Sequence, residues 1–318
     1  MDELRSRADI EFVYYREKQL RHLVKLARIG GTIPSFPDVP LDAETFFRIS
    51  VKKGCVGTVR NMAHLYGISL VNRLDVKSRS PLFIAAKYGH FVIVEDLVRL
   101  GSKSIDVQDK HKCTPLFVAA DKGHASIVAL LVRLGSRAID TTIPHGRTPM
   151  HQAAMNGHVS VIELLVRLGS KVIDTPDNNF RTPVHLAASS GHVSAIETLV
   201  RLGSNAIDTR EFFGSTPMHA AASHGHAPVI EMLVRLGSKA IDIPDGDGLT
   251  PIDVASASEN KECVKTLIAL NNNIVGGLDV NEDDRGDVRF RVYFSQSLVS
   301  RLLFLLECLE NFSLTKRI

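Results

Sequence analysis

The sequence has almost no excess of charge of either sign: 38 Lys and Arg against 35 Asp and Glu give a formal net charge of +3 over 318 residues. This balance lacks the basic footprint of a dedicated nucleic-acid-binding protein, so we do not expect nucleic acid as a partner. Also missing are a run of about 18 uncharged apolar residues, which a membrane-spanning helix needs, and an apolar signal segment after residues 1–7. These absences predict a soluble protein that is not secreted and has no transmembrane segment.

Cysteine is scarce as well. The four residues Cys55, Cys113, Cys263 and Cys308 include no CxxC pair. The sequence therefore encodes neither a disulfide framework nor a zinc knuckle. A reducing compartment fits this usage, and we expect a cytoplasmic location, with a nuclear one left open.

Catalytic motifs are absent too. The sequence contains no glycine-rich phosphate loop, no nucleophile elbow and no metalloprotease helix. The segments outside its central part, residues 1–44 and 272–318, are too short for an ordinary catalytic domain. We therefore expect no enzyme activity, no catalytic residues, no cofactor and no small-molecule substrate.

What the sequence does contain is an internal repeat with a period of 34 residues. Proline recurs at this step at Pro81, Pro115, Pro149, Pro183, Pro217 and Pro251. Two columns of glycine, which include Gly157 and Gly169, and one of aspartate, which includes Asp174, keep the same phase. Four columns in phase indicate an array of copied units.

Each copy predicts two short helices. Thr148 can cap the first helix, Pro149 suits its first turn because that N–H has no helical partner, and Gly157 can end it in a left-handed conformation. The second helix is predicted from Val159 to Leu168, with a broad apolar stripe. One such pair cannot bury its own apolar face, so consecutive copies must stack and share a core.

The third copy resembles the ankyrin repeat, since it reads Thr148-Pro149-Met150-His151-Gln152-Ala153-Ala154, then Gly157-His158, then Leu164-Leu165 before Gly169. The resemblance covers roughly residues 45–271. It implies an all-α ankyrin-repeat solenoid in which each unit has two antiparallel helices and a projecting hairpin loop.

The sequence departs from the family pattern in two ways. The family period is about 33 residues, and here an extra residue lies between the second helix and the hairpin. The family's histidine is present at His151, His185 and His219, but its place is taken by Phe83, Phe117 and Asp253 in other copies. Those copies must satisfy their local hydrogen bonds differently.

We predict three segments. Residues 1–44 comprise a helix over residues 3–29 and a Pro/Gly linker. The array spans residues 45–271, with a degenerate N-terminal cap (45–79), repeats starting near 80, 114, 148, 182 and 216, and a C-terminal cap (250–271). Residues 272–318 comprise a strand-like segment near 288–294 and an amphipathic helix near 297–312, which packs on the last repeat, dimerises or docks into a partner's groove.

Two polar columns have a plain structural interpretation. Histidines such as His219, His224 and His226 in one copy raise a metal hypothesis, but equivalent histidines on stacked helices lie about 10 Å apart, too far to share one ion. We therefore expect no metal. An arginine column, which includes Arg201, has a glutamate four residues earlier in every copy except at Arg133, which predicts i,i+4 ion pairs on a solvated face.

Positions that differ between copies are free to face a partner. The resemblance places one such set along the concave groove: Lys87, Tyr88, Asp121, Lys122, Met155, Asn156 and His224. A second set lies at the hairpin tips: Lys77, Lys110, His111, His145, Asn178, Asn179, Phe212 and Phe213. We expect Phe212 and Phe213 to anchor a partner, because aromatic side chains dominate interface energetics; alternatively, one of them folds back onto Phe180.

The sequence therefore predicts a protein–protein interaction module, a scaffold or recognition protein that binds a macromolecular partner through the tips and the concave helix face. The alternative is an adaptor whose C-terminal helix recruits a second partner, such as a ubiquitin ligase, or mediates self-association through residues 297–312. A purely structural spacer would have no discrete high-affinity partner.

Overall fold

The computed structural model describes residues 43–275, and every regular element within that range is a helix. The predicted helix over residues 3–29, the strand-like segment near 288–294 and the helix near 297–312 lie outside the described residues. The described part divides into two compact units, residues 43–144 and residues 145–275.

The first unit opens with three helices where the degenerate cap was predicted: α2 (Ala43–Lys53), α3 (Val56–Tyr66) and α4 (Ile68–Asn72). Two helix pairs and a 3-10 turn follow: α5 (Pro81–Lys87) with α6 (Phe91–Arg99), α7 (Pro115–Asp121) with α8 (Ala125–Arg133), and η1 (Ala138–Asp140). Helix α5 packs against α2 on one side and α7 on the other, and α6 packs against α8.

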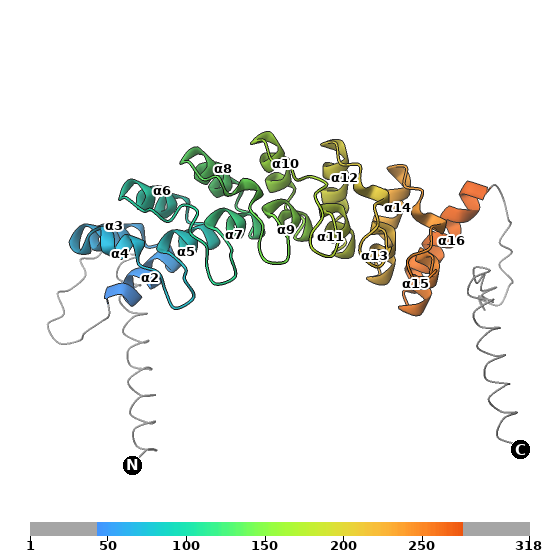
Figure 1. The fold of residues 1–318 in the computed structure, drawn as a ribbon, viewed down its shortest axis with the longest axis horizontal. Coiled ribbons are helices and arrows are strands. Elements are labelled where there is room, and N and C mark those ends of the chain that lie inside the picture. The colour runs from blue at the N-terminus through green and yellow to red at the C-terminus, as the bar shows by residue number, and fades with distance from the viewer. Residues whose placement is uncertain (1–42, 276–318) are drawn as a thin grey trace, which may run out of the picture. The chain divides into compact units, whose positions relative to one another are not determined.

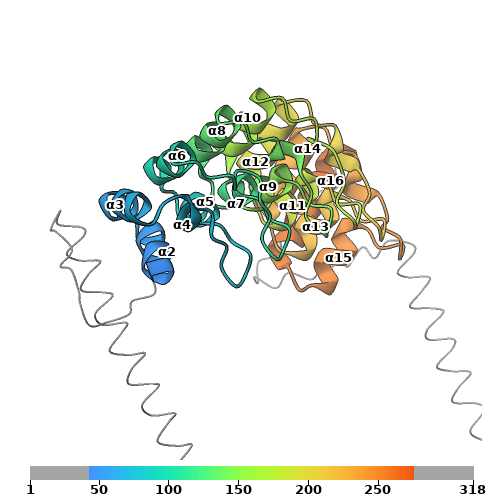
Figure 2. The same ribbon diagram turned by 60° about the vertical axis from the view of Figure 1, so that its left-hand side comes forward.

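The second unit contains four helix pairs: α9 (Pro149–Met155) with α10 (Val159–Arg167), α11 (Pro183–Ser189) with α12 (Val193–Arg201), α13 (Pro217–Ser223) with α14 (Ala227–Arg235), and α15 (Pro251–Ala257) with α16 (Lys261–Val275). Two 3-10 turns, η2 (Ala206–Asp208) and η3 (Ala240–Asp242), lie between pairs. Within this unit α9, α11, α13 and α15 form one row and the second helices another, an arrangement that both views show (Figures 1 and 2).

The helix ends follow the predicted chemistry. The Thr114 hydroxyl caps α7 by accepting a hydrogen bond from the Phe117 N–H at 3.1 Å, and the Ser80 hydroxyl caps α5 in the same way. Proline occupies the first turn of each first helix. The second helix predicted from Val159 to Leu168 ends at Arg167, with Leu168 as its C-cap.

Gly157 shows what glycine contributes after a first helix, a position that is Glu259, with a φ of 57°, in the last copy. Its φ of 71° lies in the left-handed region, which L side chains rarely adopt. A Cβ at this position would also lie 2.6 Å from Nδ1 of His192, in the next repeat. Glycine therefore permits both the turn and the close approach of the neighbouring histidine.

Alanine pairs and second-helix aliphatic residues make the core. Ala153 and Ala154 are fully buried, as are Ile162 and Leu165. Small side chains let first helices approach closely, while each buried aliphatic side chain contributes about 1.5–3 kcal/mol relative to an exposed one. The shared core confirms that no pair buries its apolar face alone.

The last repeat keeps the hydrogen bonds of the others with different residues. Oδ2 of Asp253 accepts hydrogen bonds from the N–H and the hydroxyl of Thr250, at 2.9 and 2.7 Å. Asn260 replaces a histidine, and its side-chain amide donates to the carbonyl oxygens of Ala222 and Ser223 in the preceding repeat. Substituted residues in this cap therefore preserve the contact between neighbouring repeats.

The aspartate column links consecutive repeats. Asp208 accepts hydrogen bonds from the Ser238 hydroxyl at 2.5 Å and from the Lys239 N–H at 2.9 Å, one repeat further on. Asp174 binds Ser204 and the Asn205 N–H alike, and in the first unit Asp106 binds Ser136 and the Arg137 N–H. The extra residue of the period lies in the loop that forms this contact.

We expect Asp208→Ala to lower the free energy of unfolding by about 1–3 kcal/mol, because the Ser238 hydroxyl and the Lys239 N–H lose a charged acceptor. Asp242→Ala is a matched control, since Asp242 also ends a 3-10 turn but is exposed and has Asn271, at 3.4 Å, as its partner among the described residues. Its loss should stay within about 0.5 kcal/mol. Urea denaturation followed by circular dichroism measures both values, and equal losses would contradict the assignment.

Candidate functional site

A carboxylate closes most of the hairpin tips at their start; the tip that carries His145 has Ile143 at this position instead. Oδ1 of Asp177 accepts hydrogen bonds from the N–H groups of Asn179 at 2.9 Å and Arg181 at 3.0 Å. Asp245 does the same for Asp247 and Leu249. An aspartate that binds the backbone two and four residues on fixes the turn locally.

Neighbouring tips are joined through their backbones. In the second unit the Asn178 N–H donates to the His145 carbonyl, the Phe212 N–H to that of Asn179 at 3.0 Å, and the Gly246 N–H to that of Phe213 at 2.8 Å. In the first unit the Lys110 N–H donates to the Lys77 carbonyl at 3.0 Å. The tips of each unit therefore present their side chains from a connected support.

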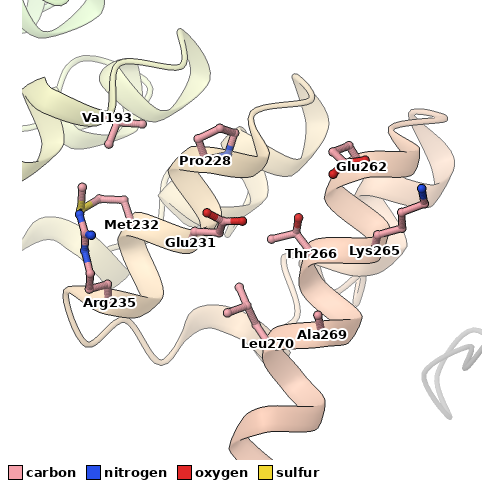
Figure 3. A pocket seen from close by; sticks show the side chains of 10 residues that line it. All are labelled: Val193, Pro228, Glu231, Met232, Arg235, Glu262, Lys265, Thr266, Ala269 and Leu270. Atoms are coloured by element: carbon pink, nitrogen blue, oxygen red, sulfur yellow. The ribbon is translucent and has the colours of Figure 1, made fainter. Parts of the chain in front are cut away.

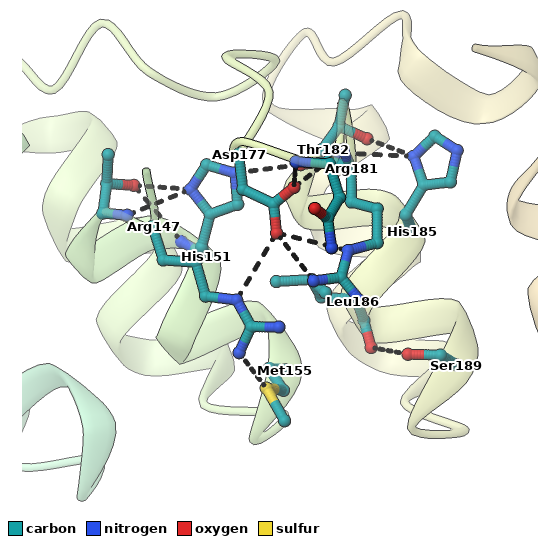
Figure 4. Close-up of polar contacts among 11 residues, drawn as sticks. Arg147, His151, Met155, Asp177, Arg181, Thr182, His185, Leu186 and Ser189 are labelled. Carbon is teal, nitrogen blue, oxygen red and sulfur yellow. Dashed lines mark hydrogen bonds and ion pairs between the residues drawn. The ribbon is translucent and has the colours of Figure 1, made fainter. Parts of the chain in front are cut away.

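Buried histidines connect the first helices to the tips (Figure 4). Nδ1 of His151 accepts hydrogen bonds from the N–H and hydroxyl of Thr148, and Nε2 lies 3.2 Å from the carbonyl oxygen of Arg181, at the end of the next tip. His185 makes the same contacts with Thr182 and with the carbonyl of Ser215. Because Nδ1 accepts and Nε2 donates, each imidazole is neutral.

Burial opposes protonation of these imidazoles. It lowers the pKa of His151 and of His185 from the ordinary 6.5 to about 4, despite the backbone carbonyls that accept from Nε2. The same cause lowers the pKa of His219. The scaffold that holds the tips therefore depends on uncharged histidine.

Asp177 also joins two arginines beneath the tips. Its Oδ2 lies 3.0 Å from Nη2 of Arg181 and 3.4 Å from Nε of Arg147, and its side chain is almost completely buried. Burial raises the pKa of this carboxyl, but hydrogen bonds from Arg181 and Asn179 outweigh it, so the net pKa is lowered. The ionised carboxylate fixes two successive tips to each other.

Three exposed phenylalanines gather on the second unit's tips. The rings of Phe180 and Phe212 stack with centroids 6.2 Å apart, and Phe213 meets Phe212 edge-on at 5.2 Å. Their exposed fractions are 55%, 65% and 70%. Phe212 therefore does contact Phe180, as one alternative predicted, yet neither ring is buried by the contact.

Phe180 was missing from the predicted site residues, although the period contained a signal for it. It has a φ of 60°, in the left-handed region, and the equivalent positions one repeat before and after are Gly146 and Gly214. Three copies carry glycine at this position and three carry a side chain in the left-handed conformation, Ser78, Lys112 and Phe180, of which Phe180 is the bulkiest.

The other predicted site residues divide between the units, and none of them is buried. In the second unit His145, Asn178, Asn179 and His224 are exposed, while Met155 and Asn156 are half-buried. In the first unit Lys77, Tyr88, Lys110, His111 and Lys122 are exposed, and Lys87 and Asp121 are half-buried. The ammonium of Lys52 lies 5.4 Å from the ring centroid of Tyr88.

The predicted arginine pairs need correction. Arg99 binds Glu95 within its own helix, at 3.0 Å, as expected. Arg201 instead binds Glu163 of the preceding repeat, at 2.5 Å, and Arg133, predicted to be unpaired, lies 3.9 Å from Glu95. Neighbouring second helices lie close enough for long side chains to reach across, and such exposed pairs contribute about 0–1 kcal/mol.

The histidines of the fifth repeat, which starts near residue 216, have structural contacts. Nε2 of His226 lies 3.1 Å from the Ser189 carbonyl, and Nδ1 of His224 lies 2.9 Å from the Ala220 carbonyl. Among residues 43–275, no group of three or more His, Cys, Asp and Glu side chains is arranged to hold a metal ion. Nor is any helix in that range long and apolar enough to cross a membrane.

A hollow of about 700 Å³ lies between α14 and α16 (Figure 3). Met232 and Leu270 give it an apolar lining, and Glu231 and Lys265 bring charges of both signs. It contains none of the residues predicted from the variable positions. Its mixed lining offers neither a nucleophile beside a base nor a set of metal ligands.

Stacked helix pairs with projecting tips define a helical-repeat protein whose variable side chains are displayed on a fixed support. A family model of ankyrin repeats in three copies matches residues 47–143, 134–209 and 201–284. The chain therefore belongs to the ankyrin-repeat family, whose members generally serve as protein–protein interaction scaffolds without catalytic activity.

The solved structures support the same fold. The crystal structure of the human ASB11 ankyrin repeat domain matches with a TM-score of 0.61 and 22% sequence identity, over 74% of this chain and 99% of that one. A search of curated protein sequences finds no match.

The neutral histidines predict acid sensitivity. Above pH 6.5 the stability that they contribute is fully present; below it the unfolded chain gains protons that folded His151 and His185 refuse, down to about pH 4. The free energy of unfolding should fall by up to about 1.4 kcal/mol per pH unit for each histidine. His185→Phe introduces the residue that two other copies carry at this position, Phe83 and Phe117. This variant should show a shallower fall in urea titrations at successive pH values; parallel curves would contradict this role.

Proposed function

We propose that this protein is a recognition module that binds another protein through its hairpin tips and helix groove, with Phe180, Phe212 and Phe213 as the anchor. This set is called the aromatic tip cluster below. Membership of the ankyrin-repeat family supports protein binding in general. The observation that carries the finer proposal is the backbone conformation of Phe180.

A left-handed conformation costs an L-residue about 1–2 kcal/mol. Burial of a phenylalanine ring could offset that cost, but the Phe180 side chain is 55% exposed. Glycine occupies the equivalent position at Gly146, Gly214 and Gly248. Within the fold the Phe180 ring has the stacked Phe212 as its ring partner and stays exposed, whereas burial against a protein partner would offset the backbone cost.

The support of the cluster favours binding as well. The Phe212 N–H is bonded to the Asn179 carbonyl, and the Phe213 carbonyl accepts from the Gly246 N–H. Rings held before binding lose less conformational entropy when a partner arrives. The exposed side-chain amides of Asn178 and Asn179 lie on the tip of Phe180, next to the tip of Phe212 and Phe213, and offer hydrogen bonds around an apolar centre.

The other predicted residues are proposed as peripheral contacts. Polar side chains around an aromatic anchor exclude water and contribute less individually. The partner is a protein with an apolar side chain that can enter the aromatic tip cluster. The cytoplasmic location stays a prediction of the sequence.

Phe180→Gly separates binding from folding. We expect the variant to keep its stability or gain up to about 1 kcal/mol, because the left-handed strain is relieved, while its capture of protein partners from a cell extract falls. Phe212→Ala with Phe213→Ala should reduce capture further. Affinity purification with quantitative mass spectrometry measures capture, and urea denaturation measures stability.

Tyr66→Ala is the control for these variants, because Tyr66 is another aromatic residue that is 53% exposed, in the first unit's cap. Its partner set should match that of the wild type. An unchanged partner set in all of the tip variants would exclude the aromatic tip cluster as the anchor.

The adaptor function remains a second candidate, because the sequence places Leu298, Leu302, Leu305 and Leu309 on one stripe beyond the array. Deletion of residues 287–318 should leave the partners of the tips bound and remove a second set, such as a ubiquitin ligase. Loss of dimer mass in light scattering would instead indicate self-association. If neither the partner set nor the mass changes, the adaptor function is wrong.

A further inference from the structure

The near-neutral net charge of the chain conceals an uneven distribution. Residues 43–144 contain fifteen Lys and Arg but eight Asp and Glu, whereas residues 145–275 contain ten and thirteen. The first unit is therefore strongly basic and the second mildly acidic. An excess of charge on one unit predicts a partner surface of the opposite sign.

Several carboxylates of the first unit are occupied within the fold. Asp75 and Asp109 accept tip N–H groups, and Asp75 also binds the Arg79 guanidinium. Asp96 binds Arg60 through both carboxylate oxygens. These carboxylates bind N–H groups and guanidinium groups within the first unit, and these partners compensate their negative charge.

Three lysines at two adjacent tips have no such compensation. Lys77, Lys110 and Lys112 are all exposed, and the backbone bond from Lys110 to Lys77 holds their tips together. Within residues 43–144 no ion pair involves any of the three. Val76, which is 83% exposed, lies beside Lys77. These four residues are called the basic tip surface below.

Lys112 has the same unusual backbone conformation as Phe180. Its φ of 63° lies in the left-handed region, at the repeat position that Phe180 occupies in the second unit. The side chain is exposed, so burial does not offset the backbone cost. A lysine retained at a position that favours glycine indicates a use for its charge outside the fold.

We propose that the basic tip surface of the first unit binds an acidic protein segment, one in which Asp or Glu residues flank an apolar side chain that contacts Val76. This inference rests on the proposed protein-recognition function and names the chemistry of a partner at a second place on the array. Acidic residues meet the three ammonium groups, and their desolvation is limited because the tips are open to water.

Protein is favoured over nucleic acid by the residues beside Lys77. The Arg79 guanidinium, two residues further on, is occupied by Asp75 and so is not available to grip a phosphate from two sides. The exposed Val76 suits an apolar side chain and offers nothing to a phosphate.

The test measures binding of short fluorescent peptides to the full chain by anisotropy. One peptide alternates Glu and Asp with Val and Ala, a second replaces the acids by Gln and Asn, and a single-stranded oligonucleotide of equal charge is the third probe. We expect the acidic peptide to bind at least about tenfold more tightly than its amide counterpart and to weaken as salt is raised. Equal binding of the two peptides, or preference for the oligonucleotide, would overturn the proposal.

Charge-reversal variants locate the site. Lys77→Glu, Lys110→Glu and Lys112→Glu together should weaken acidic-peptide binding by about tenfold or more. The matched control, Lys103→Glu with Arg133→Glu and Arg137→Glu, changes the net charge equally at exposed positions away from the tips. Equal losses in both triples would show a general charge effect and refute the site.

Failure here is distinguishable from failure of the proposed function. If the acidic peptide shows no preference while Phe180→Gly still loses its captured partners, the chemistry assigned to the basic tip surface is wrong and protein recognition by the array stands. If the peptide test succeeds and Phe180→Gly captures normally, the array binds through the first unit alone.

Discussion

The array depends on hydrogen bonds that each repeat must make to the next. The Nε2 of His151 reaches the carbonyl at the end of the following tip, and the carboxylate of Asp208 reaches a hydroxyl and an N–H in the following repeat. Neither group has a complete set of partners inside its own copy. Burial of apolar faces draws the copies together, and these polar contacts fix their register.

This constraint separates two kinds of position along the period. Residues that reach a neighbour change little between copies. Asn260 keeps the contact of the histidine that it replaces, whereas Phe83 and Phe117 give up the hydrogen bonds of the histidine column in the first unit. Residues at the tips meet no such requirement, because backbone hydrogen bonds, and in most tips one carboxylate such as Asp177, already close the turn. Chemistry can therefore change from tip to tip without disturbing the stack.

Sequence periodicity predicted the first kind of position well. Proline, threonine and glycine define helix ends through local backbone geometry, so the helix pairs and their stacking followed from one chain. The role of the aspartate column did not follow, since its partners lie about thirty residues away and only the folded turn brings them together. Arg201 was misassigned for a similar reason: spacing within a helix gave Glu197, but the neighbouring helix supplies Glu163.

Phe180 and Lys112 occupy the same position of the repeat, and both have a left-handed backbone conformation. At both, the copies agree on a left-handed turn, and at both a bulky, exposed residue stands at a position that favours glycine. Variable positions alone could not single them out, because drift between copies produces the same variability. Backbone strain at an exposed side chain distinguishes a residue with a function from a residue that arose by drift. Selection for folding alone would favour replacement of the strained residue.

The two residues also differ in chemistry. Lys112 is cationic and lies in the unit with an excess of basic residues, whereas Phe180 is aromatic and lies in the mildly acidic unit. The formal net charge of +3 for the whole chain argued against nucleic acid as a partner. That inference averaged over units with opposite excess charge. Electrostatic attraction acts over about 8–10 Å at physiological ionic strength, which is far less than the length of a repeat array, so the charge of a single tip surface decides what it binds.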